Sequence, residues 1–343
     1  MPKEKWLIDP SELDEFQREI RELGLTDSYV VKGCAGSGKT ILALYRAHDI
    51  KIDAAARGQT ASFTMVVFTK ALQSFIQSGI RQLGIGPRQV VYHKKWDRSQ
   101  VDHIIVDEAQ DFDKAEIDEF DAAKFKSIML YGDSQQQIYG GKLSTEQIAA
   151  HLTLDDLELK KNYRLPKLIA SFVSHVSRDK ELEKKCVKTG SAKPRLKEFA
   201  TWQDELNYII AEINTRNYTD VAILLPFNEP GKAPLNNFHR NIMMVKNYFD
   251  SLEFSAEYKI NDSMDLDFDS ELPKVMTYHS CKGLQFETVF IPFCDFPGHD
   301  NWFINNYKNP LYVGLTRTYR NLYLTYSEDL TPFFKGIPST KYD

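Results

Sequence analysis

The sequence contains few cysteines and no long apolar segment. Its four cysteines, in 343 residues, are scattered and form no Cys-x-x-Cys or Cys/His pair. This spacing argues against a structural zinc site and against a disulfide framework, and it suits a reducing compartment. No uninterrupted apolar run exceeds five residues, and the polar start, Met-Pro-Lys-Glu-Lys-Trp, does not resemble a signal peptide. We therefore expect a cytoplasmic protein that does not associate with membranes.

An excess of basic residues is also absent. The chain has 43 Lys and Arg against 48 Asp and Glu, a formal net charge of −5. A protein with this balance is not attracted to nucleic acid as a whole, so any contact with phosphates must use local basic groups. Hydrophobic residues make up 42% and aromatic residues 12%, which supports packed cores, and the length suits two domains.

The most informative segment is residues 33–40, Gly-Cys-Ala-Gly-Ser-Gly-Lys-Thr, which has the complete pattern of a phosphate-binding loop. A strand-like apolar run precedes it and a helix-like run follows it, as this chemistry requires. The glycines let backbone N–H groups surround a polyphosphate, while the Lys reaches the β- and γ-phosphates and the Thr ligates Mg²⁺. The predicted nucleotide-binding residues here are Gly33, Gly36, Ser37, Gly38, Lys39 and Thr40.

Short β-rich runs alternate with helical patterns along the whole chain. The predicted strands are 28–33, 64–69, 89–93, 103–107 and 127–132, then 195–199, 221–225, 274–278, 288–293 and 322–326. The predicted helices of the second half are 166–177, 202–214, 237–250 and 310–319. Near-continuous apolar strands favour parallel sheets covered on both faces. We expect an α/β protein with two domains, 1–155 and 156–343.

A pair of carboxylates follows one of these strands. Asp107 and Glu108 end the apolar run 103–107, downstream of the phosphate-binding loop. At the loop end of a parallel sheet, Asp107 can hold Mg²⁺ and Glu108 can polarise the water that attacks a γ-phosphate. This predicts a nucleoside triphosphate hydrolase.

Seven motifs in order make the chain resemble superfamily 1 helicases of the UvrD/Rep/PcrA type over nearly its whole length. Besides the phosphate-binding loop and the carboxylate pair, they are the segments 68–72 (Phe-Thr-Lys-Ala-Leu), 131–139 (Tyr-Gly-Asp-Ser-Gln-Gln-Gln-Ile-Tyr), 162–164 (Asn-Tyr-Arg), 276–286 (Met-Thr-Tyr-His-Ser-Cys-Lys-Gly-Leu-Gln-Phe) and 311–317 (Leu-Tyr-Val-Gly-Leu-Thr-Arg). The resemblance implies two RecA-like P-loop domains with parallel sheets, and an ATP site at the cleft between them.

The resemblance also assigns roles to residues outside the phosphate-binding loop. It implies that Gln17 reads adenine, that Gln136 senses the γ-phosphate, and that Gln285 lies at the nucleotide cleft. Arg164 and Arg317, from the second domain, are expected to neutralise charge on the transferred phosphoryl group. The residues expected to contact single-stranded nucleic acid are Thr69, Lys70 and His279.

The chain lacks the two large insertions of the full-length helicases in this group. Only 35 residues separate Lys70 from Val106, and a short acidic loop, 261–273, stands where the second insertion would fall. Gly140 and Gly141 stand where a base-stacking Trp is usual, and position 285 is Gln instead of the usual Glu. These departures favour an ATPase over an enzyme that unwinds duplexes alone.

The expected function is ATP hydrolysis with Mg²⁺, coupled to binding, translocation along or remodelling of single-stranded nucleic acid, with DNA as the expected strand. The type implies 3′ to 5′ polarity. One alternative is a nucleotide-switched ATPase subunit that works with a protein partner such as a nuclease, in DNA repair or anti-phage defence. RNA as the strand, or a small-molecule kinase, are further alternatives. The segments 93–96 (His-Lys-Lys-Trp) and 180–197 are further basic candidates for phosphate contacts, or ordinary solvated loops.

Overall fold

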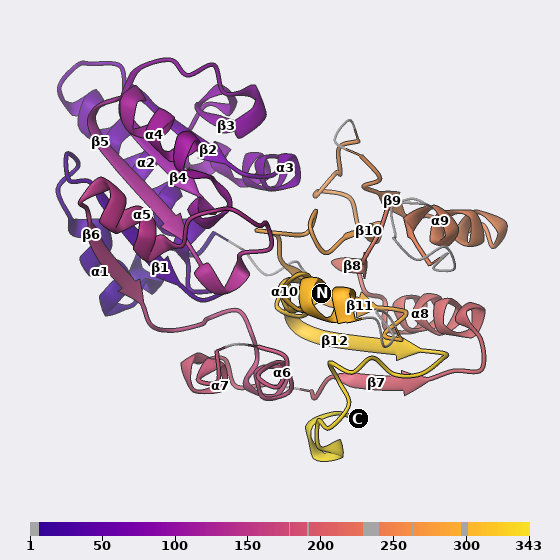
Figure 1. The fold of residues 1–343 in the computed structure, drawn as a ribbon. Coiled ribbons are helices and arrows are strands. Elements are labelled where there is room, and N and C mark those ends of the chain that lie inside the picture. Colours follow the sequence, from indigo (N-terminus) through magenta and orange to yellow (C-terminus); the bar gives the residue numbers. More distant parts are fainter. Residues whose placement is uncertain (1–6, 178, 191, 229–239, 262–263, 296–300) are drawn as a thin grey trace. The chain divides into compact units, whose positions relative to one another are not determined.

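The structure is a computed structural model that describes residues 7–177, 179–190, 192–228, 240–261, 264–295 and 301–343 (Figure 1). The described residues fold into two compact units, one that ends at Tyr163 and one that runs from Arg164 to Asp343. The sequence places the boundary after residue 155, inside strand β6 (Asp155–Leu159). Because β6 pairs with β1 (Tyr29–Gly33), the chain does not leave the first unit until it has completed that strand.

The first unit is built on a parallel sheet of six strands in the order β3-β2-β4-β5-β1-β6. The remaining strands are β2 (Phe63–Val67), β3 (Val90–Tyr92), β4 (Val101–Asp107) and β5 (Lys124–Gly132). Its helices are α1 (Glu15–Glu22), α2 (Lys39–Ala56), α3 (Lys70–Gly79), α4 (Lys114–Ala123) and α5 (Thr145–Leu152). All strands are parallel, so their carboxyl ends meet at one edge of the sheet.

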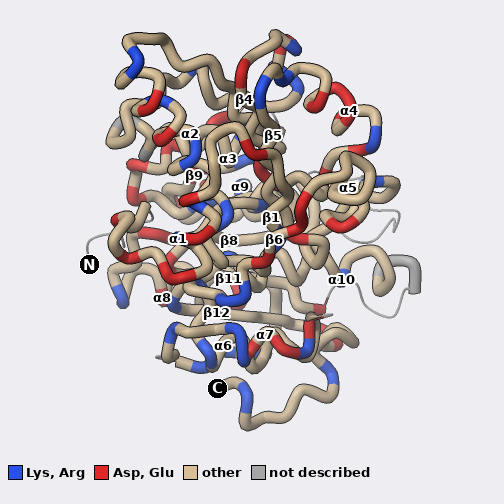
Figure 2. Tube along the Cα trace, turned by 90° about the vertical axis from the view of Figure 1, so that its left-hand side faces the viewer, with Lys and Arg blue, Asp and Glu red and all other residues tan. Residues whose placement is uncertain are grey.

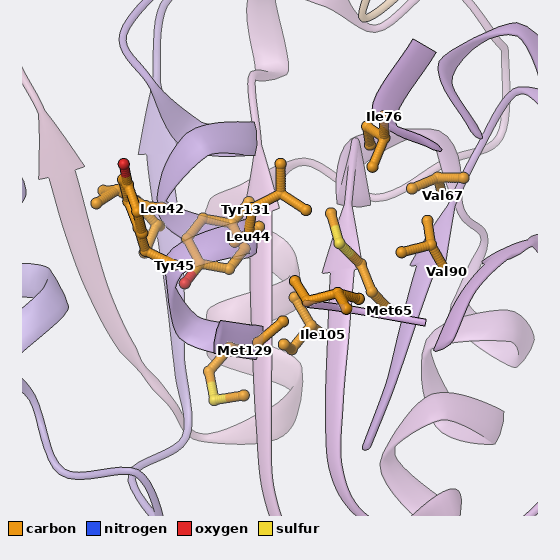
Figure 3. Close-up of a cluster of buried hydrophobic side chains, with 14 of the residues drawn as sticks. Leu42, Leu44, Tyr45, Met65, Val67, Ile76, Val90, Ile105, Met129 and Tyr131 are labelled. Atoms are coloured by element: carbon orange, nitrogen blue, oxygen red, sulfur yellow. The ribbon is translucent and has the colours of Figure 1, made fainter. Parts of the chain in front are cut away.

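Two apolar clusters hold this sheet between its helices. Successive strand residues point to opposite faces, so Val31 packs with α1, α2 and α3 while Val30 packs with α4 and α5. Figure 3 shows the first of these clusters, in which Leu42 and Leu44 of α2 and Ile76 of α3 lie over strand residues such as Met65 and Ile105. The sheet is therefore covered on both faces, as the near-continuous apolar strands predict.

The second unit contains another six-stranded parallel sheet, in the order β7-β12-β11-β8-β10-β9. Its strands are β7 (Arg195–Glu198), β8 (Val221–Leu225), β9 (Glu257–Tyr258), β10 (Lys274–Thr277), β11 (Phe286–Ile291) and β12 (Thr318–Tyr326). Its helices are α6 (Lys167–Val173), α7 (Leu182–Lys185), α8 (Trp202–Arg216), α9 (Ile242–Ser251) and α10 (Asn301–Leu315). Apolar side chains of α8 and α9 pack on one face of this sheet. Two RecA-like α/β domains account for both units.

The helix predicted over 310–319 is wrong at its end. The α-helix finishes at Leu315, and β12 begins at Thr318. Thr318 and Tyr319 are residue types that favour strands, and β12 pairs with β11 and β7. Sheet pairing therefore decides the conformation of residues that could continue the helical pattern. The start of the helix predicted at 237–250 lies outside the described residues, and α9 occupies the rest.

Across the part of the chain that the structure describes, we find no helix with the length and apolarity needed to span a bilayer.

Candidate nucleotide-binding site

The phosphate-binding loop lies where β1 meets the first turn of α2, at the carboxyl edge of the first sheet. Gly36 and Gly38 have φ values of 78° and 92°, in the left-handed region that suits glycine. A Cβ atom at Gly38 would lie 2.5 Å from Nε2 of Gln17, so a side chain there would displace the carboxamide of Gln17. The loop thus needs both glycines to adopt this path.

The side chains of the loop fit a bound polyphosphate. Oγ of Ser37 is buried and has no hydrogen-bond partner among the described residues, although buried hydroxyls usually have one. Lys39 is also buried, and its ammonium donates to the carbonyl oxygens of Gly33 at 2.7 Å and Cys34 at 3.1 Å. A cation held over a loop of backbone amides at the N-terminus of an 18-residue helix is a favourable environment for an anion.

Thr40 and Asp107 meet beside the loop. Oγ1 of Thr40 donates a hydrogen bond of 2.7 Å to Oδ2 of Asp107, which is fully buried. Burial, followed by the neighbouring charge of Glu108, raises the pKa of Asp107 to about 6. Hydroxyl and carboxylate oxygens are the ligands that Mg²⁺ prefers, and a bound cation would favour the ionised carboxylate. This pair could therefore hold the magnesium ion of a bound nucleotide.

Glu108 has a backbone conformation that is unusual for its residue type. Its φ of 56° and ψ of 41° lie in the left-handed region, where non-glycine residues are uncommon and tend to occur at functional sites. Its N–H donates to Oδ1 of Asp107 at 2.9 Å, and its Oε2 accepts from Nε2 of Gln110 at 2.7 Å. The backbone turn and Gln110 together fix the direction of this carboxylate.

The same hydrogen-bonded chain continues to the end of β5. Oε1 of Gln110 accepts from the N–H of Asp133 at 2.8 Å, and Oδ2 of Asp133 accepts from Nε2 of Gln136 at 2.7 Å. Gln110 thus bridges Glu108 and the segment that carries Gln136. Neither Gln110 nor Asp133 is among the residues predicted from the sequence, although Gln110 closely follows the carboxylate pair and Asp133 lies inside the motif 131–139. Their signal is position, since each follows the carboxyl end of a strand, β4 or β5.

Gln17 lies against the back of the phosphate-binding loop. Its Nε2 donates to the carbonyl oxygen of Ser37 at 2.9 Å, and its side chain is 2% exposed. Its Oε1 accepts from the N–H of Asp14, the residue that caps α1, at 3.0 Å. The structure therefore brings together the first-unit candidates Gln17, Gly33, Gly36, Ser37, Gly38, Lys39, Thr40, Asp107, Glu108 and Gln136.

The second-unit candidates gather at the segment between β10 and β11. Nε of Arg164 donates to Oε1 of Gln285 at 3.1 Å. Arg317 is buried, and its guanidinium donates to the carbonyl oxygens of Val313 at 2.8 Å and Leu284 at 3.4 Å. These three candidates therefore lie at one place in the second unit. That the arginines act on a γ-phosphate stays a prediction.

The candidates for nucleic-acid contact come from both units. Thr69 caps α3, because its Oγ1 accepts from the N–H of Leu72 at 3.0 Å, and Lys70 is the first residue of that helix. His279 follows β10, and burial, then the charge of Lys282, lowers its pKa to about 4, so the imidazole is neutral near pH 7. Their contacts with nucleic acid stay predictions.

The ring of Trp96 is not available as a base-stacking platform. Trp96 is 6% exposed, and its ring packs against Phe120 at 4.9 Å between centroids. His93 stacks on Phe68 at 4.9 Å. Trp96 therefore belongs to the apolar cluster beneath α4. Within the segment 93–96, this leaves Lys94 and Lys95 as the exposed side chains that could reach phosphates.

The sequence matches two helicase families. Residues 26–293 match the Schlafen group 3 DNA/RNA helicase domain, and residues 274–325 match the UvrD-like helicase C-terminal domain. The first match covers most of the chain. The chain belongs to the Schlafen group 3 DNA/RNA helicase domain family. With its UvrD-like C-terminal segment, it is a superfamily 1 helicase domain of the UvrD/PcrA type, which confirms the resemblance.

Curated helicases are similar to parts of this helicase domain. The ATP-dependent DNA helicase PcrA of Staphylococcus aureus is 30% identical over 162 residues, which are 43% of this chain and 22% of that protein. The putative ATP-dependent DNA helicase R568 of Acanthamoeba polyphaga mimivirus is 24% identical over 248 residues, 65% of this chain and 34% of that protein. The chain thus spans between a fifth and about a third of the length of these relatives.

Solved helicase structures are also similar. The Arterivirus nonstructural protein 10 helicase in complex with DNA has a TM-score of 0.49 and 15% identity, covering 91% of this chain and 63% of that one. The C-terminal domain of a possible DNA helicase from Lactobacillus plantarum has a TM-score of 0.37 and 15% identity, covering 52% and 96%.

Proposed function

We propose that this helicase domain hydrolyses ATP with Mg²⁺ when it binds single-stranded nucleic acid, with DNA as the strand. The observation that carries the proposal is the hydrogen-bonded chain that starts at Thr40, beside the phosphate-binding loop, and ends at Gln136. Such a chain joins the triphosphate end of the site to the carboxyl ends of neighbouring strands. The names of the PcrA and R568 relatives, both ATP-dependent DNA helicases, support ATP and DNA as the ligands.

Each residue of the first unit has a separate task in this proposal. Lys39 exchanges its carbonyl partners for the β- and γ-phosphate oxygens, and the loop amides bind the remaining charge. Thr40 and Asp107 would hold Mg²⁺, which would neutralise charge on the phosphates. Glu108, oriented by Gln110, accepts a proton from the attacking water.

Gln136 links this chemistry to the nucleic acid. Its carboxamide donates to Asp133, and Asp133 is tied through Gln110 to Glu108. A change in the γ-phosphate position that moves Glu108 would therefore be felt at the segment 134–139. The segment 134–139 and Thr69 both follow β-strands at the same edge of the sheet. The segment can therefore transmit the change to a nucleic-acid strand bound there.

We further propose that Arg164 and Arg317 provide positive charge for the transferred phosphoryl group. The geometry that supports this is their common position at residues 284–285 of the second unit. A guanidinium is always charged and offers several donors, which suits the delocalised charge of a phosphoryl group in transfer. Translocation with 3′ to 5′ polarity follows from the UvrD/PcrA type and is part of the same proposal.

The first test is steady-state ATP hydrolysis by the purified chain and by Lys39→Ala, with Mg²⁺ and a single-stranded oligonucleotide. We expect the variant to retain less than about 1% of the turnover of the parent, because it loses the cation on the transferred phosphate. Tyr29→Phe, which removes one hydroxyl from the core of the same unit, is the control and should keep its activity. Equal turnover of Lys39→Ala and the parent would contradict the proposal.

A further inference from the structure

Tyr163, the last residue of the first unit, is bonded to the back of the phosphate-binding loop. Its backbone N–H donates to the carbonyl oxygen of Gly36 at 2.9 Å. Its phenol hydroxyl donates to Oδ2 of Asp14, at the start of α1. One residue that follows β6 in the chain therefore contacts both the loop and the helix that carries Gln17.

Asp14 joins these contacts to Gln17 through a capping box. Its Oδ1 accepts from the N–H of Gln17 at 2.8 Å, while its own N–H donates to Oε1 of Gln17 at 3.0 Å. Burial raises the pKa of Asp14, but the hydrogen bonds from Tyr163 and Gln17, together with the ion pair with Lys161 at 3.5 Å, outweigh it and leave the pKa below its ordinary value. The carboxylate is thus ionised and serves two donors at once, which makes both hydrogen bonds charge-assisted.

These contacts also determine which way the carboxamide of Gln17 faces. The N–H of Asp14 can only donate and the carbonyl of Ser37 can only accept. Oε1 of Gln17 must therefore face Asp14, and Nε2 must face Ser37, at 2.9 Å. Nε2 lies close to Gly38, where a Cβ atom would be 2.5 Å away, so the absence of a side chain at Gly38 makes room for the carboxamide in this position.

Fixing two carbonyl groups of the loop also fixes its amide groups, because a trans peptide is planar with its C=O and N–H antiparallel. The peptide plane between Gly36 and Ser37 is held at both ends. The carbonyl of Gly36 accepts from the N–H of Tyr163, and the N–H of Ser37 donates to the carbonyl of Cys34 at 3.2 Å. The hydrogen bond from Gln17 to the carbonyl of Ser37 sets the direction of the next N–H in the same way. Amide direction is what a phosphate-binding loop offers to its ligand.

We infer that Asp14, Gln17 and Tyr163 form a brace behind the phosphate-binding loop and are positioning residues for the triphosphate, whatever base the nucleotide carries. This inference rests on the proposed function for the existence of nucleotide binding. It gives Gln17 a task besides the reading of adenine that the resemblance implies. A brace of this kind lowers the cost of binding by ordering the loop in advance.

The experiment compares the parent chain with Tyr163→Phe, which keeps the ring and loses only the hydrogen bond to Asp14. Dissociation constants are measured by titration calorimetry for MgATP, MgGTP and magnesium tripolyphosphate, the last having no base. We expect all three constants to rise by a similar factor, about three- to tenfold, as a charge-assisted hydrogen bond that orders the loop is lost. Hydrogen exchange of the amides of residues 36–38, without any nucleotide, should also become faster.

Two further variants control for unfolding and for generic loss of a hydroxyl. Asp14→Ser keeps a capping residue with Gln at the third helical position, but its short side chain cannot reach Tyr163, so it should behave like Tyr163→Phe. Tyr29→Phe should leave all three constants unchanged. An unchanged affinity for tripolyphosphate in Tyr163→Phe and Asp14→Ser would overturn the brace, whether or not ATP binds more weakly. Failure of the parent to bind MgATP would overturn the proposed function itself.

Discussion

The backbone of Glu108 shows how single residues carry the chemistry of this domain. A left-handed conformation at a non-glycine residue costs free energy, and it persists only where surrounding contacts enforce it. Here the N–H of Glu108 is held by Asp107 and its carboxylate by Gln110. The strain therefore directs a carboxylate into the site, beside the residues that would hold Mg²⁺.

Glu108→Gln is expected to bind ATP with nearly the affinity of the parent and to lose about 10²-fold or more in turnover, the range of a general base. The amide keeps the size of the side chain but cannot accept a proton from water. Calorimetry with MgATP and a phosphate-release assay measure the two properties separately. Turnover at the parental rate would show that another group activates the water.

His279 makes the stability of the domain depend on pH. Its folded pKa of about 4 lies below the ordinary value of about 6.5, so between these values the unfolded chain binds the extra proton. The contribution of this residue is therefore complete above pH 6.5 and is lost as the pH falls towards 4, with a slope of up to ~1.4 kcal/mol per pH unit.

The prediction is tested by urea unfolding of the parent and of His279→Gln at several pH values between 4.5 and 7.5 (about the window set by the two pKa values). We expect the free energy of unfolding of the variant to change less steeply with pH. Parallel curves for the two proteins would contradict a buried, neutral His279.

At the scale of elements, most strands were predictable, including the edge strands β3 and β7, but the edge strands β6 and β9 were not. Central strands such as β4 and β8 are apolar on both faces, and their sequences show it directly. β6 escaped prediction because it contains Asp155, Asp156 and Glu158, which suit an edge strand that pairs on one side only. Its parallel pairing with β1 depends on the rest of the sheet and has no local signal.

The residues of the candidate site were also predictable only in part. Residues that belong to well-defined motifs, such as Lys39 and Asp107, could be selected from the sequence because their chemistry demands those types at that spacing. Gln110 and Tyr163 could not, since their roles arise from hydrogen bonds between segments far apart in the chain. Spacing alone does not reveal such contacts.

Thr69, at the N-terminus of α3, has an observed structural role as a helix cap and a predicted role in binding nucleic acid. Thr69 caps this helix, so Thr69→Ala should lower the free energy of unfolding by about 1 kcal/mol, whereas Thr69→Ser should retain it. Denaturant unfolding of both variants checks this. A stability of Thr69→Ala equal to that of the parent would contradict the cap. Weaker binding of a labelled single strand by both variants, including the stable Thr69→Ser, would indicate a contact by the methyl group.

At the scale of the whole molecule, function must arise from local features because the chain is acidic overall. Figure 2 shows Lys and Arg interspersed with Asp and Glu along the trace, including the segments around α6 and α7. In that region Lys184 pairs with Glu181 and Lys185 with Asp179.

The segment between α3 and β4 is short. It contains β3 and three short 3₁₀ helices, and it leaves no room for a further domain. We therefore propose ATP hydrolysis that a single strand stimulates, without unwinding of duplexes by this domain alone.

The most direct test measures ATP turnover by the chain with Mg²⁺, alone and with single-stranded DNA or RNA, with Glu108→Gln as the inactive control. The account predicts that a single strand raises turnover about tenfold or more, as expected for a site completed only when the strand is bound. Turnover that is absent, or that no DNA or RNA changes, would contradict it.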